Sequence, residues 1–115
     1  MKDDRVYLLH IRDALRQIRD YTKEGESVFL SDRKTQDAVI RNFEIIGEAA
    51  RAIEPAIKHK HASIPWNDII GMRNVIVHVY FGVLPKVVWD IVTTELPMLK
   101  IQIQAVYDDL KANKH

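Results

Sequence analysis

The chain has 115 residues, of which 47% are hydrophobic and 29% charged, a balance typical of one globular domain. Its 17 basic and 16 acidic residues give a formal net charge of +1, so any contact with nucleic acid must come from local clusters of cations. The absence of cysteine excludes disulfides, thiolate metal sites and thiol catalysis. No signal-peptide core and no apolar run near the ~20 residues that span a bilayer is visible, so we expect a cytoplasmic protein with one domain over residues 1–115.

Apolar residues recur at helical intervals along the chain, and no alternating strand pattern of useful length is visible. We predict a first helix over about 4–23, ended by Gly25. A second helix is predicted from an N-cap at Ser31 or Asp32 to about 54, where Pro55 stops it. The predicted buried residues of these two helices share one face of each: Leu8, Ile11, Leu15, Ile18, Val39, Phe43, Ile46, Gly47, Ala50 and Ile53.

Three further prolines divide the second half of the chain. A polar connection over 55–64 is predicted to precede Pro65, which starts a third helix. Pro85 is predicted to open a fourth helix, and Pro97 either kinks it or begins a fifth that ends near residue 111. The short connections favour antiparallel neighbours, so the predicted fold is all-α, an up-and-down bundle of four to five helices.

The third helix carries the chain's most informative stretch, in which an arginine, an amide, a histidine and a tyrosine lie within eight residues. Arg73, Asn74, His78 and Tyr80 are groups from which a phosphoryl-transfer site can be built. On a helical wheel Asn74 and His78 stack four residues apart, with Arg73 beside them. All three lie off the apolar stripe that is predicted to face the chain's own core, whose members are Ile69, Met72, Val75, Ile76 and Val79.

The polar face of this third helix also contains apolar residues. Ile70 and Val77 lie between Arg73 and His78 on the wheel, where a solvated helix should carry charge. A helix that is apolar nearly all round needs a second cover, and in so small a chain we expect another copy across a two-fold axis. We therefore predict a homodimer in which two Arg–His sets face each other.

The pattern R-x-x-x-x-H-x-Y resembles the signature of the HEPN ribonucleases, and in particular of the small HepT-like toxins. The likeness extends over ordered blocks of sequence: VIRNFEIIGEAA (39–50), IPW (64–66), IGMRN (70–74), HVYF (78–81) and VVWDI (87–91). It implies a HEPN-type bundle, a homodimer with a composite cleft, and metal-independent endoribonuclease activity that acts as a toxin on RNA. By the family pattern Arg73 and His78 are the catalytic pair, and Asn74 is the polar residue after the arginine.

These roles suit the chemistry of the side chains. The pKa of an unperturbed histidine, near 6.5, lets His78 act as general base or general acid. The guanidinium of Arg73 can hold two phosphate oxygens and stabilise the phosphorane, while Asn74 either orients the histidine ring or bonds the phosphate. The ribose 2′-hydroxyl is the nucleophile, so we expect 2′,3′-cyclic phosphate products and neither a metal nor another cofactor.

The resemblance also implies a protein partner, a minimal nucleotidyltransferase that serves as the antitoxin. This partner would transfer AMP from ATP to the signature tyrosine, here Tyr80. The added phosphodiester would compete with the RNA phosphate for Arg73.

Three other groups of residues could form binding sites. Arg5, Arg12, Arg16 and Arg19 fall within an arc of about 60° on the first helix, which makes either a ridge for an RNA backbone or a solvated face offset by acidic neighbours. Lys58, His59, Lys60 and His61 are predicted to form a solvent-facing basic loop rather than a metal site. Trp66 and Trp89 are predicted to be core or interface residues before they are base-stacking ones.

The sequence is also consistent with two functions other than ribonuclease activity. One is a HEPN module without catalysis that binds a nucleotidyltransferase partner or nucleotides. The other is a structural helical adaptor, which predicts that Arg73 and His78 are buried in fixed ion pairs.

Overall fold

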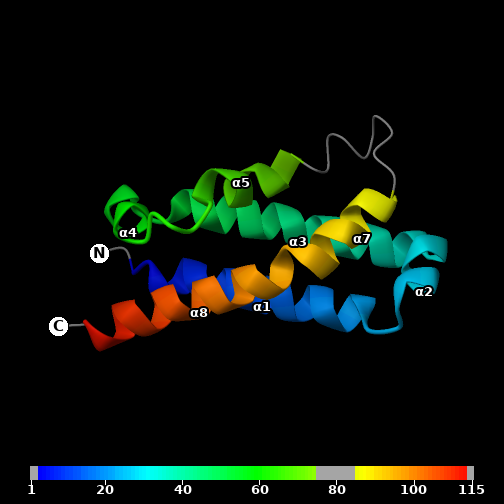
Figure 1. Ribbon diagram of the computed structural model, residues 1–115, viewed down its shortest axis with the longest axis horizontal. Coiled ribbons are helices and arrows are strands. Elements are labelled where there is room, and N and C mark those ends of the chain that lie inside the picture. Colours follow the sequence, from blue (N-terminus) through cyan, green and yellow to red (C-terminus); the bar gives the residue numbers. More distant parts are fainter. Residues whose placement is uncertain (1–2, 75–84, 114–115) are drawn as a thin grey trace.

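The computed structural model describes residues 3–74 and 85–113, and every regular element in these two ranges is a helix (Figure 1). The predicted all-α fold is therefore confirmed. In chain order the elements are α1 Arg5–Thr22, α2 Glu26–Ser31, α3 Arg33–Ala52, α4 Pro55–Lys60, α5 Trp66–Gly71, the 3-10 helix η1 Met72–Asn74, α7 Pro85–Thr94 and α8 Leu96–Ala112.

The core forms where α1 packs antiparallel to α3 (Figure 1). Both helices place aliphatic and aromatic residues at three- and four-residue steps, so each presents one apolar stripe to the other. Phe43 and Ile46 of α3 and Ile11 of α1 are fully buried there. All ten residues predicted to be buried in these helices and just after α3 are buried, which confirms the two predicted faces.

The other helices cover this pair from two sides. The segment α5–η1 packs on α3, while α8 packs on α1 and α7 leads into it. Figure 1 shows that α1, α3, α5 and the α7–α8 pair alternate in direction, so that α1 begins and α8 ends at the same end of the bundle. This is the predicted up-and-down arrangement.

Three short helices of six residues add to the four longer helices of the described residues. Of these, α2 follows Gly25, whose φ of 95° suits glycine, and it buries Phe29. The polar connection predicted over 55–64 is wrong in part, because 55–60 form α4 with Pro55 in its first turn.

Proline and aspartate set the ends of the longer helices. Asp32 is the N-cap of α3, where its carboxylate accepts hydrogen bonds from the Lys34 backbone N–H at 3.1 Å and the Thr35 hydroxyl at 2.7 Å. Pro97 lies in the first turn of α8 after a break at Glu95, so it begins a new helix and does not kink the preceding one. Within the described residues, no helix combines the length and apolarity that crossing a membrane requires.

The α1–α3 contact leads to a stability prediction. Phe43→Ala should lower the free energy of unfolding by about 3–5 kcal/mol, because it removes a fully buried ring and leaves a cavity. Ile46→Val, a milder change in the same core, should cost about 1 kcal/mol. Urea denaturation followed by circular dichroism measures both. Val28→Ala, at an exposed position of α2, is the control and should change stability by no more than about 0.5 kcal/mol.

Candidate functional site

The signature begins where α5 ends. The backbone N–H of Met72 donates to the carbonyls of both Ile69 and Ile70, which tightens the last turn and leads into η1. Arg73 and Asn74 therefore lie in a 3-10 turn, whereas the sequence analysis placed them on a regular α-helix. The Asn74 side chain is exposed. This exposure makes the side chain accessible to a ligand from solvent.

The remaining members of the signature fall outside the described residues. This applies to His78, Tyr80 and the side chain of Arg73. Their convergence with Asn74 stays a prediction. Of the two apolar residues that suggested a second cover, Val77 also lies outside the described residues, whereas Ile70 is half-buried and packs partly against the chain's own core.

The elements on either side of the signature are firmly attached to the bundle. On one side η1 packs on α3. On the other, the ammonium of Lys86 in the first turn of α7 lies 2.6 Å from a carboxylate oxygen of Glu26 in α2 and 3.3 Å from one of Asp90. These bonds raise the pKa of Lys86 above its ordinary value, the Glu26 bond contributing most. The ring of Trp89 packs against Phe29 at a centroid distance of 5.5 Å, which attaches α7 to α2 a second time.

A cavity of about 380 Å³ lies beside this turn, between α5–η1 and α7–α8. Its walls are largely apolar, and Gly71 and Met72 form its edge next to Arg73. Among the residues that the structure describes, the charged ones that line it are Asp68 and Glu95, both acidic. We call this space the acidic groove.

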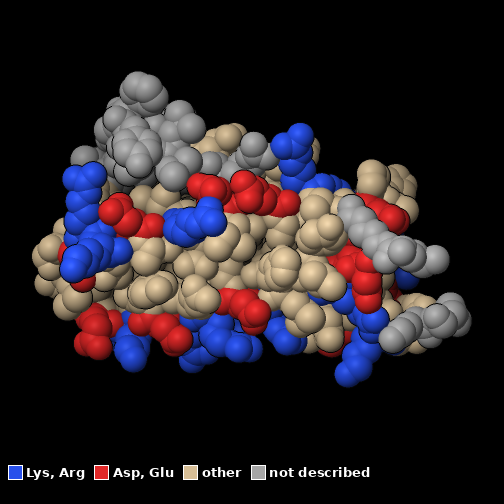
Figure 2. All heavy atoms as spheres, turned by 180° about the vertical axis from the view of Figure 1, so that it is seen from behind, with Lys and Arg blue, Asp and Glu red and all other residues tan. Residues whose placement is uncertain are grey.

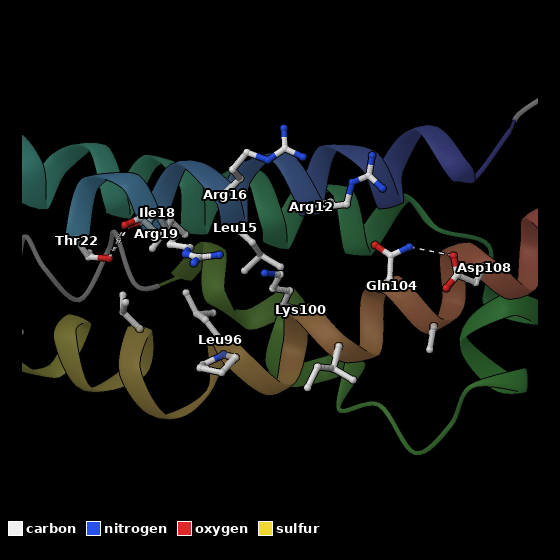
Figure 3. Close-up of a pocket in the computed structure, with 14 residues that line it drawn as sticks. Arg12, Leu15, Arg16, Ile18, Arg19, Thr22, Leu96, Lys100, Gln104 and Asp108 are labelled. Atoms are coloured by element: carbon white, nitrogen blue, oxygen red, sulfur yellow. Dashed lines mark hydrogen bonds between the residues drawn. The ribbon is translucent and has the colours of Figure 1, made fainter.

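A larger groove of about 1120 Å³ runs between α1 and α8 (Figure 3). Arg12, Arg16 and Arg19 of the predicted ridge line it together with Lys100 of α8, against one acidic residue, Asp108. Figure 3 shows the Arg19 and Lys100 side chains pointing into the space between the two helices. We call this space the basic groove.

The four arginines of the predicted ridge have different surroundings. Arg5 is outside the basic groove and pairs with Asp3, with 2.7 Å between guanidinium nitrogen and carboxylate oxygen. Arg12 is half-buried, and its guanidinium lies over the Tyr107 ring at 5.3 Å. Arg16 and Arg19 are exposed, with Asp13 at 3.9 Å from Arg16. The structure thus brings three of the four into one groove.

The basic segment 58–61 does not form the predicted solvent-facing loop. The ammonium of Lys58 donates to the carbonyls of Ala50 and Arg51 at the end of α3, at 3.2 and 3.3 Å. One carboxylate oxygen of Asp109 in α8 lies 2.9 Å from the Lys60 ammonium and 3.0 Å from Nε2 of His61. Side chains predicted to be solvated therefore join α4 to α3 and α8.

The two tryptophans behave as packing residues, as predicted. Trp66 is buried, and its indole N–H donates to the carbonyl of His61 at 3.1 Å. Trp89 is half-buried against the core. Among the described residues, no three histidine, aspartate or glutamate side chains are grouped so as to hold a metal ion.

The family model and the relatives that match this chain are all described as ribonucleases. The family model described as ribonuclease HepT-like matches residues 11–106. A "Probable ribonuclease HepT" from Thermococcus cleftensis is 44% identical over 95 residues, which cover 82% of this chain and 86% of the relative. A "Putative RNase" from Methanocaldococcus jannaschii is 34% identical over 111 residues, 96% of this chain and 92% of the relative. No solved structure matches the chain at a comparable level of significance.

One relative is much longer than this chain. It is a "Gamma-glutamylcyclotransferase and putative RNase" from Methanocaldococcus jannaschii, 37% identical over 115 residues. The match covers 99% of this chain and 52% of that protein, so this chain spans about half of its length.

The Asp109 cluster gives a pH-dependent prediction. The bonds from Lys60 and, to a lesser degree, His61 hold the pKa of Asp109 below its ordinary value of 3.8. A carboxyl group whose pKa is lower in the folded state stabilises the fold above its unfolded pKa, and this contribution is lost as pH falls through the folded pKa. Asp109→Asn should therefore lower the urea midpoint at pH 7, and the difference from the wild type should shrink as pH falls below about 4.

Asp108→Asn is the matched control, because the neighbouring carboxylate bonds to the amide of Gln104 and not to a cation. It should leave the urea midpoint nearly unchanged at both pH values. Equal losses in the two variants, or a loss in Asp109→Asn that does not shrink as pH falls below the ordinary pKa of Asp109, would contradict the assignment.

Proposed function

Because this chain belongs to the ribonuclease HepT-like family, we propose that it is a metal-independent endoribonuclease and the toxin of a cytoplasmic toxin–antitoxin pair. The observation that carries this proposal is the position of the signature. The R-x-x-x-x-H-x-Y pattern lies within the matched residues 11–106, and it begins in the turn after α5, where the Asn74 side chain is exposed. A helix end on a rigid bundle suits a group that must meet a large polymer.

The proposed reaction is cleavage of a phosphodiester by the neighbouring ribose hydroxyl. One histidine takes the 2′-hydroxyl proton as its oxygen bonds to phosphorus, and a second protonates the 5′-oxygen as it leaves. Arg73 neutralises charge on the phosphorane, and exposed Asn74 bonds the phosphate or orients His78. The products are a 2′,3′-cyclic phosphate and a 5′-hydroxyl.

This scheme requires two histidines, whereas each chain supplies one at the signature. We therefore propose that a homodimer forms the active cleft, with Arg73 and His78 contributed by each copy. The proposed partner is a nucleotidyltransferase antitoxin that attaches AMP to Tyr80, two residues beyond the proposed catalytic histidine. RNA contacts by Arg5, Arg12, Arg16 and Arg19 stay a prediction, and Arg5 is the least suited because it is already bonded to Asp3.

The central test is RNA cleavage by the purified protein in the presence of EDTA. We expect cleavage of single-stranded RNA to 2′,3′-cyclic phosphate ends, and no cleavage of the same sequence with 2′-deoxyribose. His78→Ala should lower the rate at least about 100-fold, because general acid–base catalysis contributes about that much or more. Gel analysis of end-labelled RNA measures the rate.

His59→Ala is the matched control, since His59 is exposed on α4 and has no proposed role. It should retain the wild-type rate, and circular dichroism should show both variants to be folded. Wild-type protein that binds a nucleotidyltransferase and cleaves no RNA would instead indicate a module without catalysis.

The proposed modification is tested at Tyr80. Incubation with ATP and the nucleotidyltransferase should add the mass of one AMP group to each chain and abolish cleavage. Tyr80→Phe should remain unmodified and active, because it lacks the accepting oxygen. Tyr107→Phe is the control and should be modified like the wild type. Addition of AMP to the Tyr80→Phe chain would contradict the assignment.

A further inference from the structure

The basic groove has an aliphatic floor beneath its cations. The floor is formed by side chains that α1 and α8 bury, namely Leu15, Ile18 and Leu96. On the α8 wall, Pro97, Ile101 and Ala105 follow at four-residue steps, so they lie on one side of that helix, and all three are exposed. Ile101 has an exposed fraction of 65%, the highest of the large apolar side chains in the described residues. An apolar surface bordered by charge is the usual form of a docking site.

Two cations enter the space above this floor without a counter-ion. Figure 3 shows that Arg19 reaches it from α1 and Lys100 from α8. Neither side chain forms an ion pair with a carboxylate of the described residues. Asp108 also lines the groove, but its carboxylate accepts a hydrogen bond from the Gln104 amide at 2.9 Å. Because like charges that share a groove repel each other, an anionic group between Arg19 and Lys100 would be stabilised there.

The length of the groove suits another helix. It follows α1 from Arg12 to Thr22, which is about 15 Å at 1.5 Å per residue, or about three helical turns. The surface between two packed helices is one into which a third helix can lay its apolar side, with contacts at three- and four-residue steps. The charges of the groove require that this third helix carry carboxylates beside its apolar stripe.

We propose that the basic groove is the docking site for an amphipathic helix of another protein, one with an aliphatic stripe and acidic flanks. The stripe covers Ile101 and the floor, and a carboxylate of the flank lies between Arg19 and Lys100. Arg12 contributes less, because its guanidinium is already held over the Tyr107 ring. This inference goes beyond the proposed function and does not depend on it, since the residues just before Arg73 line the acidic groove and not this one.

Other occupants fit the basic groove less well. The phosphates of an RNA strand would meet its cations, but no aromatic side chain of the described residues lines the groove for bases to stack on. RNA would therefore leave the aliphatic floor uncovered. A second copy on a two-fold axis through the groove would bring Arg19 and Lys100 against the same two cations of its partner.

The face of the bundle seen in Figure 2 has a different charge pattern. Acidic and basic residues are interspersed along both of its edges, and neither sign forms a separate side. An acidic helix placed on that face would meet carboxylates as well as cations, which makes the electrostatic match poorer than in the basic groove.

The test uses a synthetic helix as the probe. It has about 14 residues, enough to span the groove at 1.5 Å per residue, with leucine at three- and four-residue steps and glutamate on both flanks. A twin peptide carries lysine in place of every glutamate. In fluorescence anisotropy the acidic peptide should bind wild-type protein with a Kd below about 100 μM, and the lysine twin should bind at least about tenfold more weakly.

Charge reversal tests the cations of the groove. Arg19→Glu with Lys100→Glu should weaken binding of the acidic peptide at least about tenfold and strengthen binding of the lysine twin, because the double variant reverses the charge that faces the flank. Arg33→Glu with Lys111→Glu is the matched control, since both of these side chains are exposed and neither lines the groove. This control should keep the wild-type affinity for both peptides.

A second pair of variants tests the aliphatic surface. Ile101→Ser should weaken binding of the acidic peptide at least about fivefold, because it removes apolar area that the peptide covers. Met98→Ser is the control on the same helix, since Met98 is also exposed but lines the acidic groove. It should bind the acidic peptide like the wild type. Thermal unfolding should show that all four variants are folded.

Three results overturn the inference. The first is an acidic peptide that fails to bind, or that binds the wild type and the Arg19→Glu, Lys100→Glu variant equally. The second is displacement of the peptide by a 2′-O-methyl RNA strand, which the proposed reaction cannot cleave and which would assign the groove to RNA. The third is an Ile101→Ser protein with half the wild-type mass in light scattering, which would assign the groove to a second copy.

The cleavage assay separates this inference from the proposed function. Peptide binding that follows the expected pattern, in a protein that cleaves no RNA, sinks the ribonuclease proposal alone. Cleavage by a protein that does not bind the acidic peptide sinks the docking site alone.

Discussion

The antiparallel contact between α1 and α3 is the interaction on which the rest of the structure depends. Its buried residues, with Phe43 and Ile11 among them, give the two longest helices a fixed relation. Several other elements pack on this pair, since α5 and η1 pack on α3 and α8 packs on α1. The turn that holds Asn74, η1, therefore packs directly on one helix of this pair. The proposed site, which would align groups from two chains, needs such a rigid support.

Helical periodicity was sufficient to predict the two long helices and their buried faces, because burial of an apolar stripe is the main force that orients them. It was not sufficient for two of the six-residue helices, α2 and α4. Helices this short gain little from propensity, and contacts at their ends stabilise them. In α4 those contacts come from Lys58 to the end of α3 and from Lys60 and His61 to Asp109. Asp109 lies 48 residues from His61, a separation that no local pattern reveals.

In the candidate site, too, some features could be predicted from the sequence and others could not. The residue types of the signature and their spacing were readable in the sequence, because the chemistry of phosphoryl transfer restricts which side chains are useful. The 3-10 form of the turn at Met72–Asn74 could not be read from the sequence. A wheel drawn for a continuous helix places Arg73 and Asn74 on a regular surface, whereas the chain tightens into η1 after Gly71. The arginine ridge could be predicted in part. The sequence places Arg12 beside Arg16 on one helix face, but it does not show that the Tyr107 ring lies under the Arg12 guanidinium.

The sequence predicts a dimer because its third helix is apolar nearly all round and needs a second cover. In the structure Ile70 of α5 is partly covered by the chain's own core, whereas Met98 and Ile101 of α8 are exposed. The signal was present in the sequence, where apolar residues follow Pro97 on both sides of a helical wheel. What the sequence could not give was the position of α8 between grooves of opposite charge. That position requires α1 and α5 to lie on either side of it, which only the packed bundle provides.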